Sequence, residues 1–112
     1  MGTHCQLQVI NKQGELSRVE RTMDGYLILD EMINIVEDIL NDKIVVPNAY
    51  EEDIGSGMVQ YDEDCEDDYQ YLVVINYLDK SLKYSFAPIT NLMILALAKL
   101  IQQGWTIGLE DI

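Results

Sequence analysis

The sequence is poor in positive charge, and this shortage excludes one class of function. Only 7 lysines and arginines stand against 20 aspartates and glutamates, which gives a formal net charge of −13. A chain this acidic repels nucleic acid and anionic membranes, so direct binding to either is not expected. We therefore predict a cationic partner, either a basic protein or a protein that itself binds nucleic acid.

Cysteine, histidine and long apolar runs are also scarce. Two cysteines and one histidine are too few for a disulfide framework or a histidine-rich metal centre. The longest apolar run, 92–100, contains Lys99 and is too short to cross a bilayer. The first ten residues lack the basic and apolar segments of a secretory signal. We expect a cytoplasmic protein with reduced thiols, no cofactor and no membrane partner.

Apolar residues are plentiful: they make up 48% of the 112 residues. This is enough for a single domain over 1–112 with its own core. Alternation predicts strands over 5–11 and 16–22, joined as a hairpin by a turn at 12–14. A helix is predicted over 27–43, where apolar residues recur at spacings of three and four.

The second half of the chain repeats this layout. Residues 58–61 are a candidate short strand, and 69–77 and 82–86 predict a second hairpin. Pro88 suits the first turn of a helix over 89–103, and 105–108 is a candidate edge strand. The order β-β-α, acidic connector (47–68), β-β-α predicts an α+β fold. We expect an antiparallel sheet with both helices on one face.

The predicted helix over 89–103 is apolar on nearly every side, more than one face of a sheet can cover. Two interpretations remain open: it is a fully buried central helix, or it forms the seam of a homodimer.

The most unusual segment is the acidic one, where six of the seven residues over 62–68 are carboxylates. Between 44 and 79 there are ten acids and no lysine or arginine. A calcium loop beginning at Asp62 fails, because its sixth position is Asp67 instead of glycine and its twelfth is Val73 instead of glutamate. A solvated loop, or a surface for a cationic partner, explains the run better.

If this segment is extended, alternate carboxylates lie about 6.6 Å apart on one side. Phosphates along a nucleic-acid strand are also regularly spaced, with an axial rise of about 3.4 Å each, and the extended acidic segment would resemble them in this regularity. Tyrosines flank the acids and are effective interface anchors. The predicted partner-binding residues are Glu51, Glu52, Asp53, Tyr61, Asp62, Glu63, Asp64, Glu66, Asp67, Asp68 and Tyr69.

We predict no catalytic and no metal-binding residues. His4 and Cys5 are adjacent, so on a strand they point to opposite faces and cannot form a thiolate–imidazole pair. There is no Gly-rich phosphate loop and no nucleophile motif. The protein is therefore not expected to be an enzyme.

The N-terminal quarter resembles small phage and prophage proteins that begin Met-Gly-Thr-Arg and reach an Arg-x-x-Asp-Gly-Tyr motif before a helix. The matching residues are Met1, Gly2, Thr3, Arg21, Asp24, Gly25 and Tyr26. The chain departs from this pattern at His4, where those proteins have arginine, and no proline follows Tyr26. Small acidic phage proteins often counter host defence, including RNA-guided (CRISPR) nucleases, and the resemblance implies such a role in the host cytoplasm.

Together these observations give one leading hypothesis and two alternatives. The leading hypothesis is a phage-derived accessory protein that inhibits a host nucleic-acid-binding defence protein through an acidic, DNA-mimicking surface. The first alternative is a structural or assembly protein that dimerises through its apolar C-terminal helix. The second is a weak divalent-cation binder.

Overall fold

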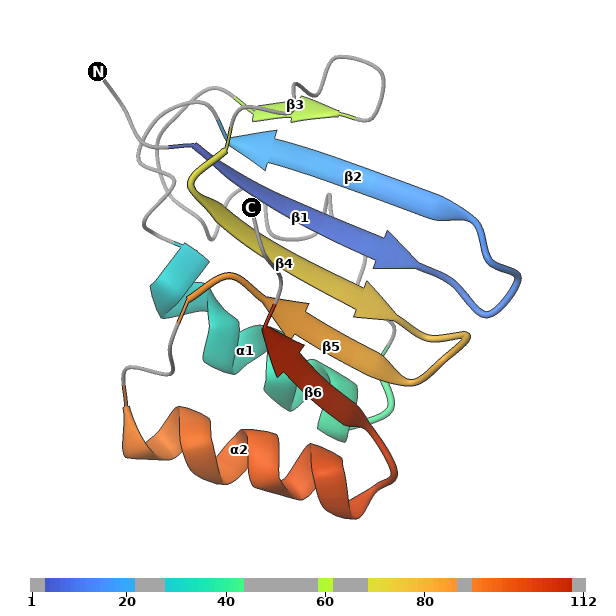
Figure 1. Ribbon diagram of the computed structural model, residues 1–112, viewed down its shortest axis with the longest axis vertical. Helices are drawn as coiled ribbons and strands as arrows, with labels where there is room; N and C mark the ends of the chain where they lie inside the picture. The colour runs from blue at the N-terminus through green and yellow to red at the C-terminus, as the bar shows by residue number, and fades with distance from the viewer. Residues whose placement is uncertain (1–3, 22–27, 44–58, 62–68, 87–89, 110–112) are drawn as a thin grey trace.

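A computed structural model of the protein describes residues 4–21, 28–43, 59–61, 69–86 and 90–109 (Figure 1). It confirms the α+β class, with two helices and a six-stranded sheet. The elements along the chain are β1 (Cys5–Ile10), β2 (Leu16–Arg21), α1 (Ile28–Leu40), β3 (Val59–Tyr61), β4 (Tyr71–Asn76), β5 (Ser81–Tyr84), α2 (Asn91–Gln102) and β6 (Thr106–Leu109).

The sheet is mixed, so the predicted all-antiparallel arrangement is wrong. Its strand order is β3-β2-β1-β4-β5-β6. The two hairpins, β1 with β2 and β4 with β5, are antiparallel as expected. However, β1 pairs with β4 in parallel, and β5 pairs with β6 in parallel. A parallel pair needs a long connection, and both connections here contain a helix.

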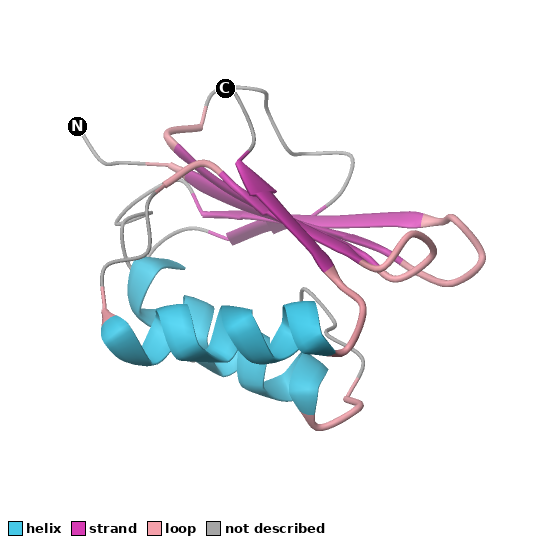
Figure 2. Ribbon diagram, turned by 60° about the horizontal axis from the view of Figure 1, so that its bottom comes forward, coloured by secondary structure: helices cyan, strands magenta, loops and turns pink. Residues whose placement is uncertain are grey.

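Both helices lie on one face of the sheet, as Figure 2 shows. The strands alternate, so every second side chain points toward the helices. Leu7 and Val9 of β1 and Val73 and Ile75 of β4 form the centre of this buried face. Their partners from α1 are Ile28, Met32, Ile35, Val36 and Ile39. They recur at the spacings of three and four that predicted this helix from the sequence.

The opposite face of the sheet is also buried at its centre. Gln6 of β1 stands beside Glu20 of β2 on one side and Leu72 of β4 on the other. The exposed fractions of these three side chains are 0%, 1% and 3%. Gln6 and Glu20 are polar, and the alternation along the strands did not predict that they are buried.

Local signals fix the ends of the elements. At the β1–β2 turn, the Asn11 side-chain oxygen accepts hydrogen bonds from the backbone N–H groups of Gln13 and Glu15, each at 2.9 Å. Gly14 has φ +84° there, a conformation that suits glycine. Helix α2 begins at Asn91 with Thr90 as its N-cap. The predicted start near Pro88 was early, and Pro88 itself lies outside the described residues.

Candidate functional site: the outer face of α2

Most of the predicted partner-binding residues lie outside the described residues. This holds for Glu51, Glu52, Asp53, Asp62, Glu63, Asp64, Glu66, Asp67 and Asp68. The backbone of Tyr61 ends the edge strand β3, and Tyr69 is half-buried two residues before the central strand β4. The strand that Tyr61 ends and the strand that Tyr69 precedes are therefore separated in the sheet by β2 and β1.

A second candidate surface is present on α2. Its inner side is formed by Met93, Ala96, Leu97 and Leu100, which are buried. Its outer side carries four large apolar side chains that are more than half exposed. Their exposed fractions are 68% for Leu92, 51% for Ile94, 59% for Leu95 and 56% for Ile101. The fully buried central helix is therefore not what the structure contains.

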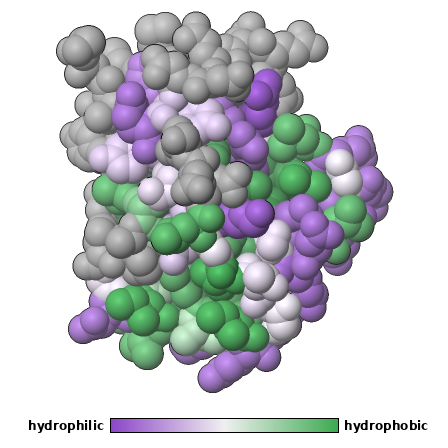
Figure 3. All heavy atoms as spheres, viewed as in Figure 1, coloured by the Kyte–Doolittle hydropathy of each residue, from purple (hydrophilic) through white to green (hydrophobic). Residues whose placement is uncertain are grey.

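The four exposed apolar side chains, together with the exposed Ala98, lie on the outward side of the helix, which we call the α2 face. Lys99 and Gln102 are exposed on this side as well. Figure 3 shows hydrophobic side chains gathered over α2 at the bottom of the view. Lys99 is the one basic residue of the helix, and its first turn carries no acid. Exposed apolar patches of this kind mark interaction sites on proteins.

Helix α1, the other member of the helical layer, is acidic. It lies beside α2 in the helical layer (Figure 2) and contains no lysine or arginine between Ile28 and Leu40. Glu37 on α1 is exposed, and Glu31 and Asp38 are half-buried. The Glu31 carboxylate accepts a hydrogen bond from the Asn34 amide at 3.2 Å, which orients it along the helix surface. The helical layer therefore carries exposed apolar side chains on α2 and carboxylates on α1.

Other site types find no support within the described ranges. No group of three or more His, Cys, Asp or Glu side chains there is arranged to hold a metal ion. Neither of the two described helices has the length and apolar character required to cross a membrane.

Comparisons with known proteins give little guidance. No protein-family model matches the chain, and no curated protein is similar to it in sequence. Among solved structures, it is similar to the NMR structure of the protein TA0956, with 18% sequence identity and a TM-score of 0.49. That alignment covers 99% of this chain and 100% of the other.

Proposed function

We propose that this protein is a binding protein, not an enzyme, and that it docks a basic amphipathic helix of a partner protein on the α2 face. The observation that carries this proposal is the exposure of Leu92, Ile94, Leu95 and Ile101 on one helix. Amphipathic helices bind by laying an apolar stripe into such a surface. Because the chain carries a net charge of −13, lysines and arginines beside that stripe are attracted to it.

Charge also argues against a second copy as the occupant. Each copy carries a net charge of −13, so two copies repel each other, and this repulsion opposes their association. A basic partner gains attraction from the same charge. The α2 face provides the apolar part of the interface, which carries most of the binding energy, while the charges accelerate the encounter.

The acidic connector over 47–68 extends this proposal to a class of target. We propose that its carboxylates contact the positively charged nucleic-acid site of a host defence protein, as the resemblance to phage proteins implies. The support is the ten acids and no lysine or arginine between 44 and 79. A channel that binds the phosphate backbone is lined with such cations, so the protein would compete with nucleic acid for it.

The docking proposal is tested with a synthetic helical peptide of leucine and lysine, labelled for fluorescence anisotropy. We expect binding that weakens as salt is raised, and a loss of at least about tenfold in affinity for the double variant Leu92→Gln/Leu95→Gln. The matched control is Leu78→Gln, because Leu78 is 58% exposed but lies in the β4–β5 turn.

Three results would contradict the docking proposal. One is that the Leu92→Gln/Leu95→Gln variant binds the peptide as tightly as the Leu78→Gln variant does. Another is equal binding of a peptide with glutamate in place of lysine. The third is a concentration-dependent dimer in light scattering that the Leu92/Leu95 change abolishes, which would assign the α2 face to a second copy instead.

A further inference from the structure

A pocket of about 260 Å³ lies at the end of the sheet where β1 and β4 finish. Its lining comes from separate parts of the chain, including the β1–β2 turn, the end of α1, the β4–β5 turn and the end of α2. We propose that this pocket binds a small planar ring that carries an oxyanion, either a carboxylate or a phosphate. The proposal is independent of the α2 face.

The position of the pocket follows from the mixed sheet. β1 and β4 are parallel neighbours, and the Tyr77 N–H donates to the Ile10 carbonyl oxygen at 2.8 Å just beyond them. From their carboxyl ends the chain turns in opposite directions, toward β2 after β1 and toward β5 after β4. Such a divergence opens a crevice at the strand ends, where open sheets with parallel strands commonly bind ligands.

Two aromatic rings provide a surface for a planar group. Tyr77 and Trp105 pack edge to face, with ring centroids 5.6 Å apart and planes at 85°. The Tyr77 hydroxyl donates to the Lys43 carbonyl oxygen at 3.3 Å, which ties this ring to the end of α1. Both rings line the pocket, so a flat ligand would contact a rigid aromatic wall.

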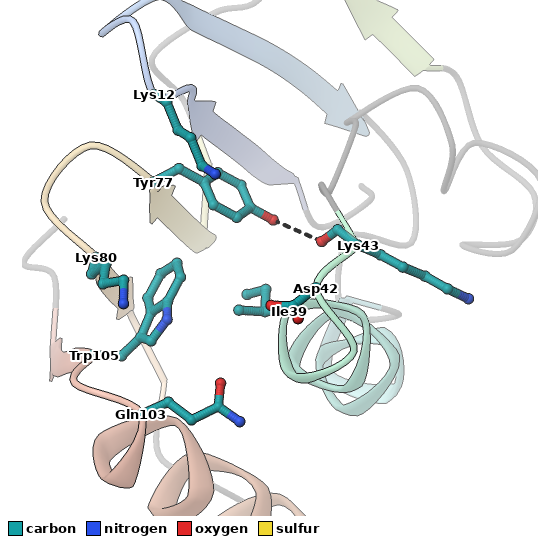
Figure 4. Close-up of a pocket in the computed structure, with 8 residues that line it drawn as sticks. All are labelled: Lys12, Ile39, Asp42, Lys43, Tyr77, Lys80, Gln103 and Trp105. Carbon is teal, nitrogen blue, oxygen red and sulfur yellow. Dashed lines mark hydrogen bonds between the residues drawn. The ribbon is translucent and has the colours of Figure 1, made fainter.

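Lysines gather at the pocket although the chain has few. Lys12, Lys43 and Lys80 all line it, three of the 7 basic residues in the protein. Figure 4 shows Lys12 and Lys80 on the side of the strands, while the Lys43 side chain extends away from the other residues. Within the described residues, neither Lys12 nor Lys80 is paired with a carboxylate. Two lysines on one side of a pocket are suited to an anionic ligand.

The opposite wall carries groups that would orient a ligand. Asp42 and Gln103 come from the ends of α1 and α2, across from the two lysines (Figure 4). Asp42 can accept a hydrogen bond from a donor on the ligand. Its φ is +59° and that of Lys80 is +53°, and these are the two non-glycine residues with positive φ in the described parts of the chain. Conformations of this kind cluster at functional sites.

The protein contains one tryptophan, so Trp105 reports directly on the pocket. The probes are 4-aminobenzoate and 4-aminophenyl phosphate, which offer a ring, an oxyanion and a donor for Asp42. We expect either or both to shift the Trp105 indole N–H signal in NMR, with dissociation constants on the order of millimolar for ligands of this size. The relative affinities of the two probes identify the preferred oxyanion.

Lys12→Gln and Lys80→Gln should each weaken binding by roughly fivefold, since each removes one exposed charge. Lys83→Gln is the matched control, because Lys83 is exposed on β5 and does not line the pocket. The proposal is overturned if the indole signal stays unmoved by both probes, or if aniline shifts it equally. It is also overturned if the Lys12 and Lys80 variants bind as tightly as the Lys83 variant.

Discussion

The hydroxyl oxygen of Thr90 accepts a hydrogen bond from the backbone N–H of Met93 at 3.2 Å. This contact satisfies one of the N–H groups that the first turn of α2 leaves without a helical partner. Thr90 itself is extended, with φ −134° and ψ 154°, as an N-cap residue should be. Thr90 therefore caps the start of the helix that carries the proposed docking surface.

Replacing Thr90 by alanine should lower the free energy of unfolding by about 1 kcal/mol, because the Met93 N–H loses its acceptor. Thr90→Ser keeps the hydroxyl, so its free energy of unfolding should lie within a few tenths of a kcal/mol of that of the unchanged protein. Urea denaturation measures both. Equal stability of the alanine and serine variants would show that the cap contributes nothing.

Leu97 and Leu95 form a matched pair on the same helix, with exposed fractions of 5% and 59%. Leu97→Ala should cost about 2–5 kcal/mol of stability, since it leaves a cavity in the core. Leu95→Ala should change stability by less than about 0.5 kcal/mol. Thermal or urea unfolding measures both variants. Similar losses of stability in the two would show that the orientation of α2 is wrong.

Gly104 ends α2 with φ +93° and has no atom within 4 Å of the position that a Cβ would occupy. The added methyl group of Gly104→Ala meets no clash. The variant should therefore lose only the free energy of unfolding that the left-handed backbone costs an alanine, about 1–2 kcal/mol. Gly108→Ala is the control, because its φ is not in the left-handed range. Urea denaturation should separate the two; a Gly104 variant as stable as the Gly108 variant would refute the assigned conformation.

Burial raises the pKa of Tyr84, whose side chain is 6% exposed. The unfolded chain ionises this phenol near pH 10, before the folded protein does. Its contribution to stability is therefore intact below about pH 10 and is lost as the pH rises through the higher folded value. Tyr84→Phe should show a smaller loss of stability between about pH 9 and 11 than the unchanged protein. The partly exposed Tyr69→Phe serves as the control, and equal losses in both variants would count against the assignment.

The acidic connector yields a test by charge removal. Changing Asp62, Asp64, Glu66 and Asp68 to their amides removes four charges and should leave folding unharmed or slightly improved. Binding to a basic partner should weaken strongly and become less sensitive to salt, as measured by titration at two ionic strengths. Unchanged affinity at low salt, with no competition by nucleic acid, would leave the acidic run as a solvated loop.

The positions of the helices and strands were predicted well from the sequence, but the pairing of the strands in the sheet was predicted poorly. Strands and helices follow from local periodicity, so both hairpins and both helices were found within a few residues. The contact between β1 and β4 joins Cys5 to Tyr71, and no local pattern encodes it. One signal was available: the unbroken apolar run from Leu72 to Ile75 is typical of a central strand that is buried on both faces.

The two candidate sites differ in how visible they are in sequence. The excess of apolar residues on α2 was apparent, but which half of the helix faces outward depends on packing against the sheet. The pocket was not visible in the sequence, because Lys12, Tyr77 and Trp105 are far apart in the chain. They meet only through the parallel pairings of β1 with β4 and of β5 with β6. The acidic residues lie outside the described parts, so their role stays a prediction.

The parallel pairing at the centre of the sheet also has a consequence for how the chain folds. Cys5 pairs with Tyr71, so the middle of the sheet cannot form until the residues of β4 have left the ribosome. Until then the β1–β2 hairpin lacks its neighbour β4, and isolated hairpins are at best marginally stable. Contacts between such distant residues slow folding. The rate of folding should therefore be limited by closure of this contact, and a fragment ending before β4 should not fold.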